Sequence, residues 1–394
     1  MVATNRHAIA IIGFSARAAA QCAIRQGFEV IAVDMCADRD LISNCHSHYL
    51  LDDPSWPDIL NSLHPSVPLL FAGGMENRLE LVDRCHSVAP RFGPTRKQLA
   101  TLRSVRNWAR WAVSSQVGWP VTLLDAPTRS DISEQLLEGD WIVKPFQSAG
   151  GIGIIDIVNA GQWNDNFLEE HSPVYLQQRL PGESIGVTFL SSEFGSTLLG
   201  ATAACESDLK PLQSDYAYRG SYGPIPLSTD QIEDLQRFAE LVQYESGIRG
   251  LWQADFLVHE RELTLLEINP RWSASMDILD VCLDLRLVEL HCACISGAMS
   301  QAKFESLSTK ACARANKPVE TSLHKFIAYA RTAFTVSVSQ SDTWWMNRWD
   351  GDLNSAINRS LFADIPSAGT HIGDGYPIMT VMTTSNSVDF SEDF

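Results

Sequence analysis

The sequence predicts a mixed α/β (α+β) fold, with a parallel sheet in the first part of the chain and more extensive β-structure behind it. Over the first 90 residues, short apolar runs alternate with helical patterns, which is typical of βαβ units. From about residue 140 onward, β-like runs follow one another with turns between them. A length of 394 residues gives room for about two to four domains.

Composition and charge exclude several classes of protein. Hydrophobic residues make up 45% of the chain, which is too many for a disordered protein. The formal net charge is −17 and no basic stripe occurs, so we expect neither a nucleic-acid nor an anionic-membrane partner. The nine cysteines are odd in number and scattered, which indicates a reducing compartment. Without a run of about 18 apolar residues or a signal-peptide pattern, we predict a soluble, cytoplasmic protein.

The first unit follows from its apolar runs. Residues 8–12, 29–33 and 68–71 are predicted strands, and residues 16–25 are a predicted helix. Strands joined through helices pair in parallel, and their ligand crevice lies at the carboxyl ends. Asp34 follows the second strand, where a dinucleotide fold would place its ribose-binding acid, but the GxGxxG pattern is absent. We therefore predict no dinucleotide here.

The remaining elements have a different character. Residues 99–113 predict one helix, and the β-like runs behind it lie at 141–143, 175–180, 185–190 and 196–202. A helix at 230–244 precedes a hairpin of residues 251–258 and 262–268. We then predict one long helix at 277–299, a polar linker at 303–320, and strands with turns within 324–338 and 363–382.

A glycine-rich loop follows the predicted strand at 141–143. Lys144 comes first, and the loop then contains Ser148, Gly150, Gly151 and Gly153. Glycines let backbone N–H groups approach phosphate oxygens, and a nearby lysine supplies positive charge. The lysine precedes the glycines, so this is not the GxxxxGK(S/T) phosphate loop. From these residues alone, phosphate binding and an ordinary hairpin turn both remain open.

The predicted hairpin carries polar side chains on one face. Asp255 lies on its first strand, and Glu267, Asn269 and Arg271 follow two residues apart on the second, so that they point to the same side. Two carboxylates and an amide oxygen suit Mg²⁺, and an arginine beside them suits an anion. The alternative is a solvated face with ordinary acids. The apolar residues around them indicate a buried hairpin, where unpaired carboxylates are costly, and this favours a metal site.

The order of these motifs resembles the ATP-grasp superfamily. Between the glycine loop and the hairpin, a predicted strand ends in Gln178, Arg179 and Leu180, followed by Pro-Gly and Glu183. The resemblance covers about residues 8–300 and is closest to predicted ATP-dependent carboligases related to biotin carboxylase. The spacing between Asp255 and Glu267 matches that of the family's two metal ligands. Residues 73–77 (Gly-Gly-Met-Glu-Asn) resemble a carboxylase loop ending in Ser-Glu-Asn, but the chain has no Met-Lys-Met biotinylation motif.

The resemblance implies a domain organisation and a set of site residues. A Rossmann-like pre-ATP-grasp domain would span residues 1–94, an ATP-grasp domain 95–302 with a lid at about 120–185, and a small C-terminal β-rich module 303–394. ATP would be held by Arg106, in place of the family's usual first lysine, and by Lys144, Ser148, Gly150, Gly151, Gly153, Gln178, Arg179, Leu180 and Glu183. Mg²⁺, or Mn²⁺, would be held by Asp255, Glu267 and Asn269, and Arg271 and Arg219 would act on the transferring group.

The implied activity is that of an ATP-dependent ligase. It would activate a small-molecule carboxylate as an acylphosphate and join it to an amine, such as an amino acid in cofactor biosynthesis, with release of ADP and phosphate. The alternatives are bicarbonate activation with carboxyl transfer, as in biotin carboxylase, and a non-catalytic ATP-binding protein. A homodimer is also compatible with the family. The sequence identifies neither substrate.

Overall fold

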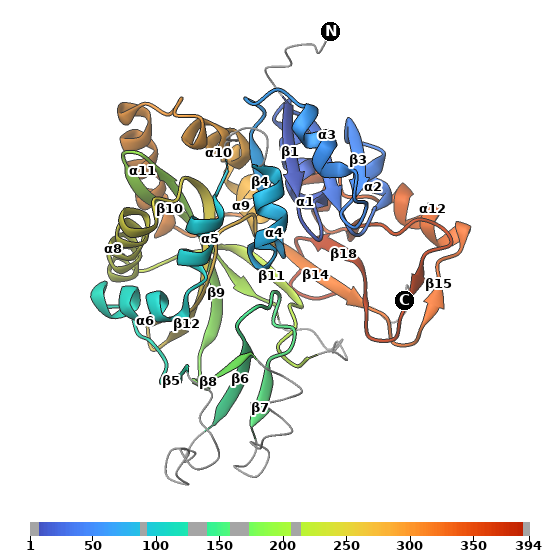
Figure 1. Cartoon of the computed structure of the whole chain (residues 1–394). Coiled ribbons are helices and arrows are strands. Elements are labelled where there is room, and N and C mark those ends of the chain that lie inside the picture. Colours follow the sequence, from blue (N-terminus) through green and yellow to red (C-terminus); the bar gives the residue numbers. More distant parts are fainter. Residues whose placement is uncertain (1–7, 87–92, 125–139, 158–172, 206–213, 389–394) are drawn as a thin grey trace.

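The computed structural model describes residues 8–86, 93–124, 140–157, 173–205 and 214–388. In Figure 1 a first α/β unit (blue) lies at the top of the molecule and a small sheet (green) at the bottom, with a large sheet between them. The parallel sheet and the larger antiparallel sheet confirm the predicted mixed α/β fold.

The first unit contains a four-stranded parallel sheet in the order β3-β2-β1-β4. Its strands are β1 (Ala8–Ile12), β2 (Glu29–Asp34), β3 (Ser47–Leu50) and β4 (Leu69–Phe71), and its helices are α1 (Arg17–Arg25), α2 (Arg39–Ile42), α3 (Trp56–Ser62) and α4 (Leu79–Cys85). A short 3₁₀ helix, η1 (Met75–Asn77), follows β4. The apolar runs predicted β1, β2 and β4 correctly. Strand β3 was not predicted, because its Ser-His-Tyr-Leu sequence contains no apolar run.

Two short helices lead into a small antiparallel sheet. Helices α5 (Arg96–Leu102) and α6 (Val105–Ser114) replace the single helix predicted at 99–113, because the chain leaves the helical conformation at Ser104 between them. The sheet has the order β5-β8-β6-β7. Its strands are β5 (Thr122–Leu123), β6 (Trp141–Pro145), β7 (Ile155–Ile157) and β8 (Val174–Gln178). The glycine loop connects β6 to β7.

The large sheet has eight strands in the order β13-β12-β9-β10-β11-β14-β18-β16. These are β9 (Glu183–Ser192), β10 (Gly195–Ala204), β11 (Gly220–Ile225), β12 (Gly250–His259), β13 (Glu262–Asn269), β14 (Leu323–Tyr329), β16 (Leu361–Ala363) and β18 (Pro377–Thr383). Helix α8 (Thr229–Ser246) packs on it through Phe238, whose ring centroid lies 6.2 Å from that of Trp252. Trp252 in turn stacks on Phe189 at 4.4 Å, so an aromatic core holds the helix and the sheet together.

The C-terminal strands continue this large sheet. Strand β14 pairs with β11, β18 pairs with β14, and β16 pairs with β18. The remaining C-terminal elements are β15 (Phe334–Thr335), β17 (His371–Ile372), α12 (Val338–Met346) and η4 (Leu353–Ala356). The domain boundary predicted after residue 302 stays a prediction, since the sheet itself runs across it.

Two predictions in the second half of the chain, a linker and a single long helix, were wrong. Residues 303–320 are not a linker, because α11 (Gln301–Ala315) occupies most of them and buries Phe304, Ala311 and Ala315. That apolar stripe is narrow, so the polar residues around it dominate the sequence. The helix predicted at 277–299 is two helices, α9 (Met276–Leu283) and α10 (Leu287–Ile295), because the chain adopts left-handed conformations at Asp284 and Arg286.

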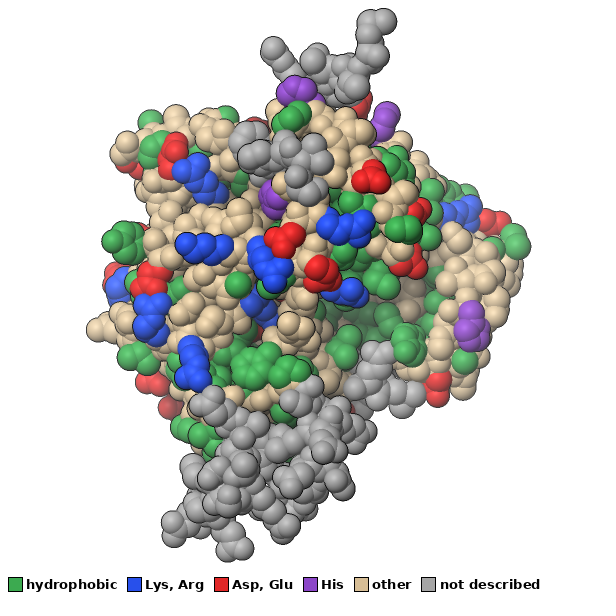
Figure 2. All heavy atoms as spheres, in the orientation of Figure 1, with side chains coloured by type: hydrophobic (Ala, Val, Ile, Leu, Met, Phe, Trp, Pro, Cys, Tyr) green, Lys and Arg blue, Asp and Glu red, His purple; other side chains and the backbone are tan. Residues whose placement is uncertain are grey.

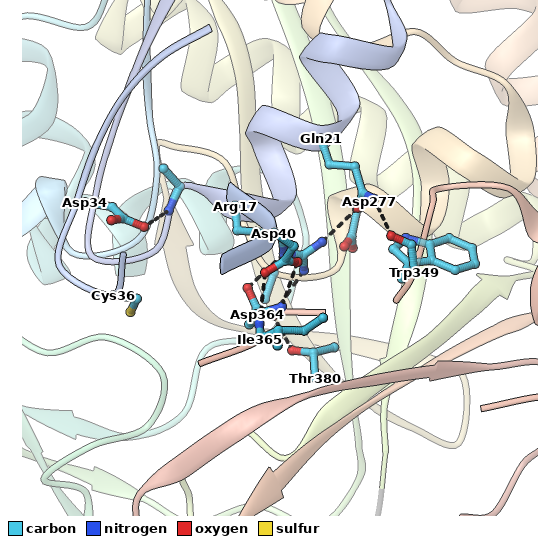
Figure 3. Close-up of polar contacts among 12 residues, drawn as sticks. Arg17, Gln21, Asp34, Cys36, Asp40, Asp277, Trp349, Asp364, Ile365 and Thr380 are labelled. Carbon is cyan, nitrogen blue, oxygen red and sulfur yellow. Dashed lines mark hydrogen bonds and ion pairs between the residues drawn. The ribbon is translucent and has the colours of Figure 1, made fainter. Parts of the chain in front are cut away.

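A buried ionic network joins the first unit to the C-terminal strands (Figure 3). Arg17 of α1 donates Nε and Nη2 to the two carboxylate oxygens of Asp364, at 2.9 and 3.1 Å. Asp364 also accepts a hydrogen bond from Thr380 of β18. Asp40 of α2 accepts the backbone N–H groups of Asp364 and Ile365. Although burial alone would raise it, the Arg17 charge lowers the pKa of Asp364 to about 2.

Charged side chains of both signs lie over the face that α4, α5 and α6 present in Figure 2, with Asp and Glu among the Lys and Arg.

Within the part of the chain that the structure describes, no helix combines the length and the apolar content needed to cross a bilayer.

Candidate active site

The predicted metal ligands lie together on two adjacent strands. Asp255 of β12 is directly opposite Glu267 of β13 in the antiparallel register. Asn269 follows two residues after Glu267 on the same face, and its Nδ2 donates to Asp255 Oδ2 at 2.9 Å and to Glu267 Oε1 at 3.1 Å. The hairpin therefore brings two carboxylates and an amide into one cluster, as the alternation of side chains along a strand predicts.

The two carboxylates differ in their tendency to ionise. Burial and the adjacent Glu267 carboxylate raise the pKa of Asp255 to about 7. Burial would also raise the pKa of Glu267, but the nearby Arg103 and Lys144 cations outweigh it and lower that pKa. The pair therefore binds a proton close to neutral pH unless another positive charge is present.

This donor set fits a hard divalent cation. Oxygen ligands from carboxylates and amides suit Mg²⁺ and Mn²⁺, which usually complete their coordination with water and substrate phosphates. Among the described residues no three His, Cys, Asp or Glu side chains are grouped to share an ion, so a cation here would depend on Asp255, Glu267, the Asn269 amide and the substrate's own oxygens. The Asn269 NH₂ group lies between the carboxylates, where a positive charge is favourable.

Arg271 lies beside this pair and is held rigidly. Its Nε donates to Glu76 Oε1 at 2.8 Å, Nη2 to Asn269 Oδ1 at 3.1 Å and Nη1 to Ser273 Oγ at 3.1 Å. Glu76 belongs to η1 of the first unit and its side chain is fully buried. Its second oxygen, Oε2, has no hydrogen-bond partner within the described part of the chain. The first unit thus contributes a carboxylate to the site; the resemblance of residues 73–77 to a carboxylase loop indicated the loop but not this contact.

Lys144 approaches the same carboxylates from the small sheet. It is buried near the end of β6, and its Nζ lies 3.3 Å from Gln177 Oε1 and 3.4 Å from the Leu266 carbonyl oxygen. Leu266 directly precedes Glu267, which explains why the Lys144 charge lowers the pKa of Glu267. Lys144 therefore lies close to the Asp255–Glu267 pair in the fold, although they are far apart in sequence.

The glycine loop turns sharply at its glycines. Gly150, Gly151 and Gly153 have φ angles of +65°, +76° and +79°, which other residues rarely adopt. A Cβ atom at Gly151 would lie 1.8 Å from the Tyr216 carbonyl oxygen, so only glycine fits there. The Tyr218 N–H donates to the Gly150 carbonyl at 2.9 Å. The loop is thus docked on the segment that precedes β11.

The cation that contacts the cluster from the α5–α6 region is Arg103. Its Nη1 donates to the Ile268 carbonyl at 3.0 Å and its Nη2 to the Ser148 carbonyl at 3.3 Å, and its guanidinium lies 3.7 Å from Glu267 Oε2. Arg106, which the sequence favoured, is an exposed residue of α6. Sequence reasoning missed Arg103 because the resemblance placed the family's first ATP-binding cation at Arg106. The role of Arg106 stays a prediction.

The remaining residues that were predicted to contact ATP or the transferring group make hydrogen bonds within the protein or lie half-buried. The N–H groups of Gln178 and Arg179 donate to the carbonyls of Val121 and Asp140, both at 2.8 Å, at the end of β8, and Leu180 follows half-buried. Glu183 is exposed at the start of β9 and accepts the Tyr222 hydroxyl at 2.9 Å. Arg219 donates to the Asp215 carbonyl at 3.0 Å, ahead of β11. Their roles with adenine, ribose and the transferring group stay predictions.

A small antiparallel sheet that carries a lysine and a glycine loop approaches a large sheet with paired carboxylates, which is the arrangement expected from the resemblance to the ATP-grasp superfamily. In agreement, residues 115–275 match the family model described as the ATP-grasp domain. Residues 115–275 therefore resemble an ATP-grasp domain, in agreement with the order of the motifs.

Curated relatives and solved structures extend this likeness beyond the domain. The formate-dependent phosphoribosylglycinamide formyltransferase of Maridesulfovibrio salexigens is 25% identical over 290 residues, which is 69% of this chain and 70% of the relative. The biotin carboxylase domain of Hydrogenobacter thermophilus 2-oxoglutarate carboxylase, solved with MgADP and bicarbonate, has a TM-score of 0.66 at 12% identity, covering 96% of this chain and 86% of that one. The L-amino acid ligase of Bacillus licheniformis has a TM-score of 0.66 at 13% identity, covering 98% and 94%. These two structures support the fold.

Proposed function

We propose that the chain is an ATP-dependent ligase that joins a small carboxylate to an amine. The observation that carries the proposal is the buried cluster in which Arg103, Lys144 and Arg271 surround the Asp255–Glu267 pair. Such a cluster suits a polyphosphate with its cation, because it offers positive groups for phosphate and carboxylates for the metal. The formyltransferase relative supports the proposal, since its name states a dependence on formate, which is a carboxylate.

The proposed reaction has two steps. An oxygen of the substrate carboxylate attacks the γ-phosphorus of ATP, the bond to the β–γ bridging oxygen breaks, and ADP leaves. The amine nitrogen then attacks the acyl carbon, phosphate departs with the former carboxylate oxygen, and the amine loses a proton. No protein nucleophile is needed, which agrees with a site of cations and carboxylates rather than a serine or cysteine centre.

The chain's own residues would bind and orient the reactants. Lys144 would hold phosphate oxygens, and Arg271 would balance the charge on the transferring group, since positioned cations account for much of phosphoryl-transfer catalysis. Asp255, Glu267 and Asn269 would hold the divalent cation, which supplies charge neutralisation for the phosphates when bound. The predicted homodimer and the cytoplasmic location remain predictions.

The first experiment measures Mg²⁺-dependent release of ADP and phosphate from ATP with a panel of carboxylates and amines. Formate, other small carboxylic acids, amino acids and bicarbonate form the panel. Turnover that needs both a carboxylate and an amine supports the ligase. Turnover with bicarbonate and no amine would indicate a carboxylase instead, and failure of the protein to bind ATP in calorimetry would overturn the proposal.

Replacing one cluster carboxylate tests the site itself. In the Glu267→Ala variant we expect ADP formation to fall by about 100-fold or more, because a pre-positioned charged group is lost from the reacting centre. Glu262→Ala is the matched control, since Glu262 begins the same strand and is exposed. The circular dichroism spectra of both variants should match that of the parent protein. Parental turnover in Glu267→Ala would contradict the assignment.

A further inference from the structure

One backbone oxygen of the glycine loop receives two side-chain donors from different parts of the fold. Asn77 Nδ2 lies 3.1 Å from the Ser148 carbonyl oxygen, and Arg103 Nη2 lies 3.3 Å from it. Asn77 belongs to η1 of the first unit, whereas Arg103 follows directly after α5. The two contacts attach the first part of the glycine loop to both neighbouring elements, while Tyr218 holds the loop farther along, at Gly150.

The arginine side chain also reaches the carboxylate cluster. Arg103 Nη1 donates to the Ile268 carbonyl at 3.0 Å, and the guanidinium lies 3.7 Å from Glu267 Oε2. The side chain is only 10% exposed and lies against Trp108, with the guanidinium carbon 5.1 Å from the ring centroid. Its Nε has no hydrogen-bond partner among the residues that the structure describes. A planar guanidinium can span two carbonyls with its two NH₂ groups, which the single ammonium group of a lysine does less well.

We infer that Arg103 is a positioning residue that fixes the glycine loop, through the Ser148 carbonyl, at a defined place relative to Glu267. The inference rests on the proposed function, in which the loop holds ATP phosphates and Glu267 holds the cation. Because Arg103 fixes the glycine loop relative to Glu267, the binding positions for the phosphates and for the cation are set before ATP binds. Asn77 of the first unit donates a hydrogen bond to the same Ser148 carbonyl oxygen, so both side chains hold the loop in place.

The test is hydrogen–deuterium exchange of the ligand-free protein, followed in peptides that cover residues 146–154. We expect these peptides to exchange about fivefold faster in Arg103→Ala and in Asn77→Ala, which is the change that loss of one ordinary hydrogen bond produces. Peptides from β9, β10 and α8 should be unchanged. Arg96→Ala is the matched control, because Arg96 is an exposed arginine of α5 paired with Asp83 on the surface, and its loop exchange should equal that of the parent protein.

The Arg103→Lys variant separates positioning from charge. Lysine keeps a cation near Glu267 but cannot span both carbonyls, so we expect its loop peptides to exchange as fast as those of Arg103→Ala. Parental exchange in Arg103→Lys would mean that Arg103 acts through charge alone, which would overturn the inference. Unchanged loop exchange in Arg103→Ala, or faster exchange throughout the protein, would overturn it as well.

A second readout connects the loop to the nucleotide. Calorimetric titration with MgATP should show about tenfold weaker binding in Arg103→Ala and in Arg103→Lys than in the Arg96→Ala control, since each tenfold corresponds to 1.4 kcal/mol. The exchange experiment uses no nucleotide, so its result stands independently of catalysis. If the parent protein binds no ATP, the proposed function fails while the exchange data still decide how the loop is held.

Discussion

The buried side chain of His291 joins three elements through its two ring nitrogens. Its Nδ1 accepts the Leu251 N–H of β12 at 3.0 Å, and its Nε2 lies 3.1 Å from the Leu69 carbonyl oxygen of β4, while the residue itself belongs to α10. These two contacts assign the neutral ring with a proton on Nε2. Burial lowers the pKa of His291 to about 4, so the folded protein resists protonation of the ring.

This histidine predicts a loss of stability in mild acid. Below pH of about 6.5 the unfolded chain takes up a proton on His291, while the folded protein does so only near pH 4. The free energy of unfolding should therefore decrease as the pH falls through this window, by about 3 kcal/mol from this residue. Urea unfolding at pH 7, 6, 5 and 4 measures the slope, and His291→Gln, which offers a donor and an acceptor without titrating, should flatten it. An equal slope in both proteins would contradict the prediction.

Single residues also show where sequence reasoning reaches its limit. The proximity of Asp255, Glu267 and Asn269 could be predicted, because residues two apart on a strand share a face and a hairpin brings its strands together. Glu76 and Arg103 could not be assigned in the same way. Their contacts are made across long sequence separations, from Glu76 to Arg271 and from Arg103 to Ser148. No local periodicity carries such information.

The break between α9 and α10 shows the same limit for whole elements. Apolar residues at helical spacing run through 277–299, so the pattern alone predicts one helix. In the structure Asp280 Oδ1 accepts the Leu287 N–H at 2.6 Å and so satisfies the start of α10. Asp284, which ends α9, adopts the left-handed conformation with φ of 46° and ψ of 50°. The tertiary fold thus selects a turn that hydrophobic spacing does not reveal.

The left-handed residue in this turn gives a prediction with opposite signs for two substitutions. Asp284 is exposed, and its conformation is one that glycine adopts without steric cost. We expect Asp284→Gly to raise the free energy of unfolding by roughly 0.5 kcal/mol, because relief of strain outweighs the greater freedom of glycine in the unfolded chain. Asp284→Ala should lower it, since alanine keeps a Cβ and loses the local hydrogen-bonding capacity of aspartate. Thermal unfolding of the two variants measures both, and equal shifts would contradict the argument.

For the molecule as a whole, the C-terminal part of the chain is joined to the large sheet by strand pairing and to the first unit by charge. Strands β14, β18 and β16 extend the large sheet, and Asp364 behind β16 pairs with Arg17 of α1 in the network of Figure 3. The sequence indicated strands in this region from turn signals. It could not indicate that this region contacts the first unit, because the Arg17–Asp364 pair joins residues 347 apart in sequence.

The costs of removing the two members of this pair should be less than additive. In Arg17→Met, the half-buried Asp364 and the buried Asp40 lose their shared counter-charge. Loss of one partner of a buried ion pair costs about 3–5 kcal/mol, and we expect the lower end because the Asp364 side chain is 23% exposed. Asp364→Asn should cost less, because Asp40 remains 3.7 Å from Arg17 and asparagine tolerates the left-handed φ of 56° at this position. In the double variant the two costs should not add, since neither a buried arginine nor an ionised Asp364 is left unpaired. Urea unfolding, monitored by tryptophan fluorescence and circular dichroism, gives the four free energies of the cycle. Strict additivity would show that the pair contributes no coupling between the first unit and the C-terminal strands.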